Sequence, residues 1–303
     1  MYLADMHCDT LTRVSSQSGL INEYNLSKKH PALQLFAAFV PKGNESPEAR
    51  RSRLLRFCDI YISEVARLKL VPVANCHDLN FAKEFDRRAA MLSVEGGGGL
   101  FADSEELNTL YRLGMRVLGL CWESNELAAS CFEECDTGLT EEGKRLVTTA
   151  SEMGIILDLS HLSDRSCEEI FELSPYPPLA THSNFREVCD TPRNLPRHIA
   201  GKIADRGGVI GLNLYPHFLS GTDVAHGEDI IRHIDYALDL FGDGHLGLGL
   251  DVDGTSGLYP IGLGEEGGSI HDRLLDLLYK RYPDRTVEKI AGENVFEFFR
   301  CNL

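Results

Sequence analysis

Side chains that commonly bind metal ions follow short apolar runs at several widely spaced points of this 303-residue chain. They are His7, Asp9, Glu95, His161, His182 and Asp251. A single polar residue at a strand end is ordinary, but this series indicates the rim of a parallel barrel, where strand ends converge on one pocket. Because these histidines and carboxylates occur without a nucleophile motif, the pattern favours metal-assisted hydrolysis.

Eight apolar, β-rich segments alternate with amphipathic segments along the chain. The expected strands cover residues 3–8, 33–40, 90–95, 116–121, 155–160, 179–182, 209–214 and 246–251. Several lack polar alternation, as expected for parallel strands covered by helices. This α/β pattern predicts a (β/α)8 TIM-type barrel, formed as one domain over residues 1–303. A doubly wound open sheet is the alternative, but it would not bring the first and last strands together.

Helix-capping patterns support the alternation of strands and helices. Ser46 followed by Pro47 predicts the start of a long helix, since serine caps helix ends and proline suits the first turn. Asp103, followed by Glu106 at the next turn, resembles a capping arrangement. Extra helices are expected after the last strand, over residues 270–282 and 286–300.

Charge and composition limit the partners and the location of the protein. The net charge of −16 argues against nucleic acid, because most of the surface would repel phosphate. The chain has no apolar stretch long enough to span a membrane, and its first residues lack the pattern of a signal peptide. The nine cysteines form no compact disulfide framework. We therefore expect reduced thiols, no membrane partner and a cytoplasmic location.

His161 and His182 are the most informative pair of candidate ligands. They close consecutive expected strands, so in a barrel they would be neighbours that can share one ion. Either histidine alone would also fit a structural role. We assign the remaining histidines to solvent or to local hydrogen bonds, and they are His30, His77, His198, His217, His226, His233, His245 and His271.

The carboxylates at the other strand ends have both functional and structural interpretations. His7 and Asp9 point to the same side of an extended segment, although a buried, hydrogen-bonded pair would have the same pattern. Glu95 precedes four glycines that allow close backbone approach to a ligand, without the lysine of a phosphate loop. A surface glutamate in a flexible loop is the alternative there. Asp251 has the position of a proton-transferring group, and a turn-forming aspartate is the alternative.

Several short motifs occur in the order found in a known family. They are His7-x-Asp9, Ser93-Val94-Glu95-Gly96-Gly97, Asp158-Leu159-Ser160-His161, Thr181-His182-Ser183, Arg193-Asn194 and Gly249-Leu250-Asp251-Val252-Asp253-Gly254. Together with the tail at residues 291–296, they make nearly the whole chain resemble the membrane (renal) dipeptidase family of zinc peptidases.

The resemblance implies a TIM-type barrel that holds two Zn²⁺ ions and hydrolyses dipeptides, including L-D dipeptides, through a hydroxide shared by the ions. The ligands that it implies are His7 and Asp9 for one ion, His161 and His182 for the other, and Glu95 as the bridge. It further implies that Asp251 transfers protons and that Arg193 holds the terminal carboxylate of the substrate. Homodimers are usual among members of the family.

The loops at residues 122–135 and 215–224 should shape the substrate pocket, so we expect Trp122 and Tyr215 to contact the substrate. Two positions depart from the family pattern. Trp122 stands where mammalian members carry a histidine that contacts the reacting oxygen, and Gly98 replaces the usual histidine after Glu-Gly-Gly. Two alternatives therefore stay open. One is a metal-dependent amidohydrolase for an acylated or cyclic amino acid, and the other is a non-catalytic metal- or ligand-binding barrel.

Overall fold

The barrel is closed by parallel strands in a computed structural model that describes residues 1–15, 30, 32–264 and 269–303. The strands are β1 Leu3–Asp5, β2 Ala32–Phe39, β3 Val71–Pro72, β4 Ala89–Glu95, β5 Met115–Gly119, β6 Ile156–Asp158, β7 Leu179–Ala180, β8 Val209–Leu212 and β9 Leu246–Leu248. They pair in the order β2-β1-β9-β8-β7-β6-β5-β4, and pairing of β2 with β4 closes the ring. Each expected strand is present, so the predicted (β/α)8 barrel is confirmed.

Strand β3 was not predicted from the sequence. It has only two residues, Val71 and Pro72, which pair with the start of β4 on the edge that β5 occupies further along. Proline has no N–H to donate to a sheet, so it is confined to such edges. β3 therefore adds to the sheet without entering the ring.

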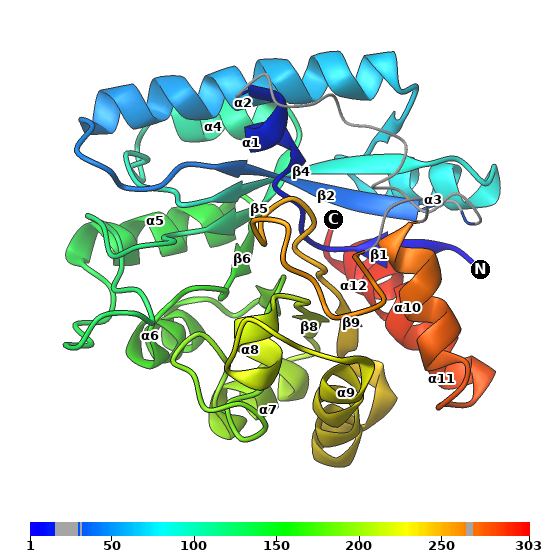
Figure 1. The fold of residues 1–303 in the computed structure, drawn as a ribbon. Helices are drawn as coiled ribbons and strands as arrows, with labels where there is room; N and C mark the ends of the chain where they lie inside the picture. The colour runs from blue at the N-terminus through cyan, green and yellow to red at the C-terminus, as the bar shows by residue number, and fades with distance from the viewer. Residues whose placement is uncertain (16–29, 31, 265–268) are drawn as a thin grey trace.

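Helices follow most strands and surround the barrel (Figure 1). They are α1 Thr10–Ser15, α2 Pro47–Arg67, α3 Cys76–Glu84, α4 Glu105–Arg112, α5 Glu141–Glu152, α6 Asp164–Leu173, α7 Arg197–Asp205, α8 Pro216–Ser220, α9 Gly227–Phe241 and α10 Ile270–Leu278. Ser46 caps α2 as predicted, because its side chain accepts the Ala49 N–H. The predicted Asp103 cap of α4 is wrong: Ser104 is the N-cap and accepts the Leu107 N–H.

Alternate strand residues divide the core into two layers. Residues on the inner side fill the barrel, and they are Ala4, Met6, Leu33, Leu35, Ala89, Met91, Val117, Ile156, Leu179 and Val209. Their neighbours, such as Leu3, Phe36 and Leu118, pack against the surrounding helices. Because both faces of the strands are buried, the apolar runs lack polar alternation. The interior is a packed core rather than a channel.

The C-terminal segment covers the end of the barrel where the strands begin. It contains α11 Asp284–Glu288, a π-helical turn at Lys289–Glu293 and α12 Asn294–Asn302. The single helix predicted over residues 286–300 is therefore interrupted by the π turn. At Gly292 an added Cβ would lie 2.2 Å from the Tyr2 carbonyl oxygen, so only glycine permits this approach to β1. Phe296 and Phe299 of α12 belong to the inner core.

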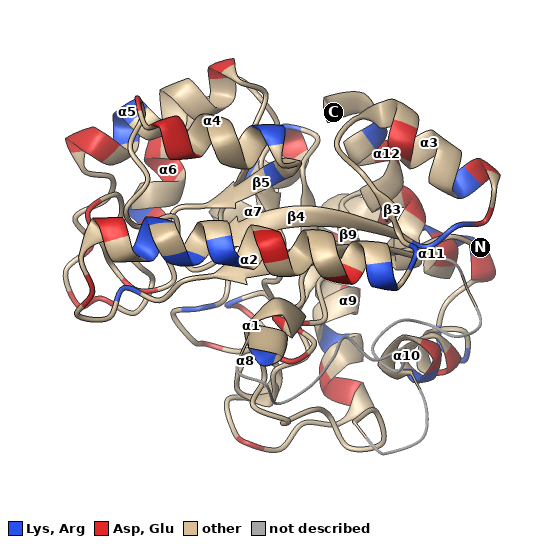
Figure 2. Ribbon diagram, turned by 90° about the horizontal axis from the view of Figure 1, so that it is seen from above, with Lys and Arg blue, Asp and Glu red and all other residues tan. Residues whose placement is uncertain are grey.

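Charged residues gather on the outer helices, such as α2, and the strands are largely free of them (Figure 2). Several buried polar side chains, among them Glu95, His161 and His182, lie instead at or just after the carboxyl ends of the strands. Among the described residues, the structure has no helix that is both long and apolar enough to cross a membrane.

Candidate metal centre

A cavity of about 370 Å³ opens at the carboxyl ends of the barrel strands. Its lining residues are Asp9, Thr12, Phe39, Glu95, Trp122, Phe132, His161, His182, Tyr215, Phe218, Asp251, Asp253, Gly254 and Ser256. The strand-end pattern in the sequence thus brought together side chains that are up to about 240 residues apart. The cavity combines a polar floor with several aromatic walls.

His7 and the carboxylates beside it form one half of the polar floor, although His7 is buried and is not itself a lining residue. Its Nε2 atom lies 3.4 Å from Glu95 Oε2, 3.6 Å from Asp9 Oδ2 and 3.9 Å from Asp251 Oδ1. The Nε2 atom is buried and has no hydrogen-bond partner among the described residues. These separations are too long for good hydrogen bonds, but they suit side chains that converge on a shared cation. The donor set therefore fits a metal ion.

His161 and His182 form the other half of the floor. Their Nε2 atoms are 2.9 Å apart, and they lie 2.9 Å and 3.5 Å, respectively, from Glu95 Oε1. The rings of His182 and His7 are stacked, with their centroids 3.7 Å apart. Glu95 thus directs one carboxylate oxygen to each half of the floor. Among the glycines after Glu95, Gly96 has a φ of +81° and lies so close to Val40 that a Cβ would clash.

The two halves of the floor differ in how they hold protons. Burial, with a smaller contribution from the positive charge of Arg193, lowers the pKa of His161 to about 4. Burial likewise lowers the pKa of His182 well below its usual value. Both rings are therefore neutral at pH 7 and have a lone pair for a metal ion.

In the half of the floor that contains His7, neighbouring carboxylates outweigh the effect of burial on the histidine pKa. Burial alone would lower the pKa of His7, but Glu95 and Asp9 outweigh burial and raise it well above its usual value. Burial and the charge of Glu95 raise the pKa of Asp9 to about 7. A cation that binds beside His7 must therefore displace a proton.

Asp251 lies at the floor beside Asn213, which the sequence analysis missed. Asn213 is fully buried and donates a hydrogen bond of 3.1 Å from Nδ2 to Asp251 Oδ2. Burial raises the pKa of Asp251. Asn213 follows β8 directly, so the signal that identified the other strand-end residues would also have identified this one. Asparagine is a weaker metal ligand than histidine or a carboxylate, so its position in the sequence alone does not indicate a metal centre.

Trp122 and Tyr215 line the cavity, whereas Arg193 lies behind it. The Trp122 ring centroid is 5.4 Å from that of Phe39 and 6.1 Å from that of His161. Arg193 is buried, and it donates from Nη1 to Ser183 Oγ at 2.8 Å and from Nη2 to the His182 carbonyl at 2.7 Å. Its Nε has no hydrogen-bond partner among the described residues. The fork predicted to hold a substrate carboxylate is therefore partly engaged by the protein.

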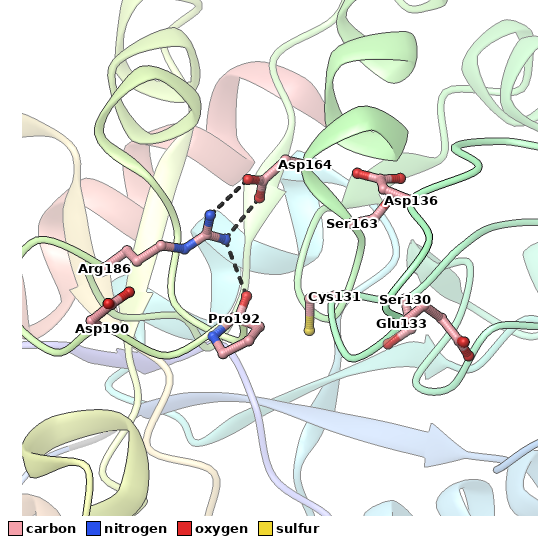
Figure 3. A pocket seen from close by; sticks show the side chains of 9 residues that line it. All are labelled: Ser130, Cys131, Glu133, Asp136, Ser163, Asp164, Arg186, Asp190 and Pro192. Atoms are coloured by element: carbon pink, nitrogen blue, oxygen red, sulfur yellow. Dashed lines mark hydrogen bonds and ion pairs between the residues drawn. The ribbon is translucent and has the colours of Figure 1, made fainter.

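A second pocket of about 280 Å³ is lined in part by the segment at residues 130–133 (Figure 3). Arg186 forms a bidentate ion pair with Asp164 there, with distances of 2.7 Å and 2.8 Å. The same segment borders both pockets, because Phe132 lines the metal cavity and Cys131 lines the second pocket. The Cys131 N–H donates to the His161 carbonyl at 2.9 Å, which ties the segment to a candidate ligand.

Two histidines assigned to solvent or local hydrogen bonds are instead buried and bonded to distant residues. His271 Nε2 lies 2.8 Å from Asp5 Oδ2, across a separation of 266 residues. His233 accepts the Phe185 N–H at Nδ1, and its Nε2 faces the Leu219 carbonyl at 3.2 Å. The sequence pattern does not reveal these partners, because helix packing alone brings them together.

Comparison with known proteins gives consistent matches over the length of the chain. The family model described as membrane dipeptidase (Peptidase family M19) matches residues 1–301. Dipeptidase 3 from Mus musculus is 27% identical over 99% of this chain and 62% of its own length, so the chain spans less than two thirds of that relative. Dipeptidase aclJ from Aspergillus oryzae is 29% identical, over 75% of this chain and 55% of its own length.

Solved structures match the fold. A metallo peptidase from Rhodobacter sphaeroides, liganded with a phosphinate mimic of the dipeptide L-Ala-D-Ala, superposes with a TM-score of 0.85. It is 23% identical, and the match covers 100% of this chain and 99% of that chain. An amidohydrolase from Pseudomonas aeruginosa superposes with a TM-score of 0.76 at 22% identity, covering 88% of each chain. These solved structures therefore share the barrel fold of this chain, although fewer than a quarter of the aligned residues are identical.

Proposed function

The chain belongs to the membrane dipeptidase family, and from this premise we propose that it is a dinuclear zinc dipeptidase. Its substrates would be dipeptides, including those with a D-residue at the C-terminal position. Relatives that are named dipeptidases support the activity, and the dipeptide mimic in the Rhodobacter sphaeroides structure supports the L-D class. The cytoplasmic location and the homodimer stay predictions from the sequence.

The position of Glu95 between two sets of nitrogen ligands carries the proposal. Oε2 faces His7 at 3.4 Å, and Oε1 faces His161 at 2.9 Å. A carboxylate with this arrangement suits a bridge between two cations. In this assignment His7 and Asp9 would hold one zinc ion, and His161 and His182 the other. When bound, the pair of ions would supply a hydroxide nucleophile at neutral pH and polarise the scissile carbonyl.

Asp251 is the residue that we assign to proton transfer. It lies 3.9 Å from His7 Nε2 at the edge of the floor, and Asn213 fixes one of its carboxylate oxygens. The free oxygen can take up the proton of the attacking hydroxide and deliver it to the departing amine. Burial raises the pKa of Asp251, which favours the uptake of a proton by its carboxylate.

The remaining predicted residues would bind the substrate. Trp122 and Tyr215 offer aromatic surface on the walls of the cavity. Arg193 would attract the terminal carboxylate, because its positive charge lies close enough to lower the pKa of both His161 and His182. Two of its nitrogens already bond to the protein, so the carboxylate would meet the remaining N–H groups.

Asp251→Asn tests the proposed mechanism. The variant should keep both zinc ions but lose nearly all turnover of a panel of L-L and L-D dipeptides, because an amide cannot accept the proton. Zinc content is measured by elemental analysis, and hydrolysis is compared with that of zinc-loaded and chelated wild-type protein. Undiminished turnover by the variant would refute the role of Asp251. If the zinc-loaded wild-type protein hydrolysed none of the dipeptides, the proposed dipeptidase activity would be refuted.

The position of Arg193 favours one alternative. Because its terminal nitrogens contact Ser183 and the His182 carbonyl, Arg193 also fits a purely structural role. The enzyme would then be a metal-dependent amidohydrolase for an acylated or cyclic amino acid. Cleavage of N-acylated amino acids with dipeptides untouched would establish that alternative.

A further inference from the structure

A chain of buried hydrogen bonds reaches His182 from the side opposite the metal centre. His182 Nδ1 lies 2.8 Å from Thr181 Oγ1, and the same hydroxyl forms a short hydrogen bond to Asp158 Oδ2. All three residues are buried, at the ends of the neighbouring strands β6 and β7. No step of the proposed mechanism uses Thr181 or Asp158.

The direction of these hydrogen bonds follows from the donors available. Asp158 Oδ1 accepts the N–H groups of Ser160 and Thr181, at 3.0 Å and 2.8 Å, and a carboxylate has no proton to donate, so Oδ2 is an acceptor as well. The Thr181 hydroxyl must then donate its one proton to Asp158 Oδ2. Its oxygen can only accept from His182, which places the proton of that ring on Nδ1. The lone pair of Nε2 therefore faces Glu95 and His161.

We propose that Asp158 and Thr181 are positioning residues that fix the tautomer and the ring orientation of His182 for metal binding. This inference rests on the proposed function, since it assigns His182 to a zinc ion. Neither residue touches the substrate, and both act through His182. Outer partners of this kind commonly change metal affinity by about 10- to 100-fold.

Asp158→Asn reverses the chain of hydrogen bonds with almost no change in shape. The two backbone N–H groups require an acceptor, so the amide oxygen of the variant must take the place of Oδ1 and its NH₂ group the place of Oδ2. Thr181 would then accept from the amide and donate to His182 Nδ1 at 2.8 Å, which is closer than its other possible acceptor, Ser160 Oγ at 3.4 Å. That arrangement moves the ring proton to Nε2, where it competes with the zinc ion.

The experiment measures zinc release from the loaded protein against a chromophoric chelator, and it needs no substrate. For Asp158→Asn and Thr181→Val, the affinity for one of two zinc ions should fall about 10- to 100-fold. Thr181→Ser keeps the hydroxyl and should stay within about threefold of the wild type. Ser151→Ala is the matched control, because it removes a buried hydroxyl that bonds to Ser174, far from the centre. Its affinity should equal that of the wild type.

Wild-type affinity in folded Asp158→Asn would overturn the proposal, as would equal losses in Thr181→Ser and Thr181→Val. If Thr181→Val does not fold, the comparison of Asp158→Asn with Thr181→Ser still decides. The positioning role of Asp158 and Thr181, called the relay below, can hold even if the protein is not a dipeptidase. A protein that binds two zinc ions and cleaves no dipeptide would refute the proposed function, while the expected losses of affinity would still support the relay.

Discussion

His161 and His182 follow the neighbouring strands β6 and β7 and face the same carboxylate oxygen, yet the protein holds them in different ways. His182 has ordinary hydrogen-bond support, because its Nδ1 meets Thr181 at 2.8 Å. The Nδ1 atom of His161 is buried and has no partner among the described residues. His161 also has a φ of +68°, a left-handed conformation that is uncommon for histidine.

Backbone contacts and aromatic packing replace the missing ring hydrogen bond at His161. Its carbonyl accepts the Cys131 N–H, and the rings of Trp122 and Phe132 lie beside it, with centroid distances of 6.1 Å and 6.4 Å. A ligand can therefore be fixed through its ring or through its backbone and neighbours. We expect the two histidines to respond to different mutations, even though we assign both to one ion.

Glu95→Gln should impair zinc binding by His161 and His182 alike, because both histidines and also His7 face this carboxylate. Loss of its negative charge should remove the bridge and lower kcat/KM by about 10³-fold or more. Zinc content and dipeptide hydrolysis are the measurements. Glu64→Gln is the control, since Glu64 is also buried but pairs with Arg67 at 2.6 Å, away from the cavity. Two tightly bound zinc ions in Glu95→Gln would contradict the bridging role.

His233 offers a third case for comparison with His161 and His182, because it is a buried histidine with protein partners at both ring nitrogens. Burial lowers its pKa to about 4, so the unfolded chain binds the extra proton first as the pH falls from about 6.5. The contribution of His233 to the free energy of unfolding is therefore fully present above pH 6.5 and is lost as the pH falls towards 4. His233→Gln should reduce the acid-induced loss of unfolding free energy by about 2–3 kcal/mol between pH 7.5 and pH 4.5.

Urea unfolding at the two pH values measures this difference. His198→Gln is the control, since more than half of the His198 side chain is exposed. The same pH dependence in His233→Gln and in the wild type would show that His233 is not held neutral by the fold.

Trp122→Ala tests the aromatic support of His161 and should have the smallest effect. An aromatic contact stabilises by about 0.5–1.5 kcal/mol, so zinc affinity should fall about 2- to 12-fold. Trp122→Phe keeps a ring beside His161 and should retain most of the affinity. Chelator competition again provides the measurement. A loss larger than that of Thr181→Val would mean that packing supports the centre more strongly than the hydrogen bonds to His182.

The sequence predicts the barrel and most of the centre because both depend on strand ends. Parallel buried strands leave apolar runs, and the residues after them meet at one rim. Partners that depend on packing leave no such trace. Asp5 and His271 pair across 266 residues, and the contacts of Arg193 with Ser183 and His182 depend on how the chain folds back after β7. The sequence therefore indicates the candidate ligands of the centre more readily than the groups that position them.

The close packing of Gly292 on Tyr2 also sets an order of events during synthesis. One edge of β1 pairs with β9, and the turn at Lys289–Glu293 lies against its backbone. His7 follows β1 and is the first candidate ligand to leave the ribosome. It acquires its fixed position only after residues 246–302 have been made. A zinc ion held beside His7, as proposed, would therefore stabilise the fold only after these segments have packed against β1.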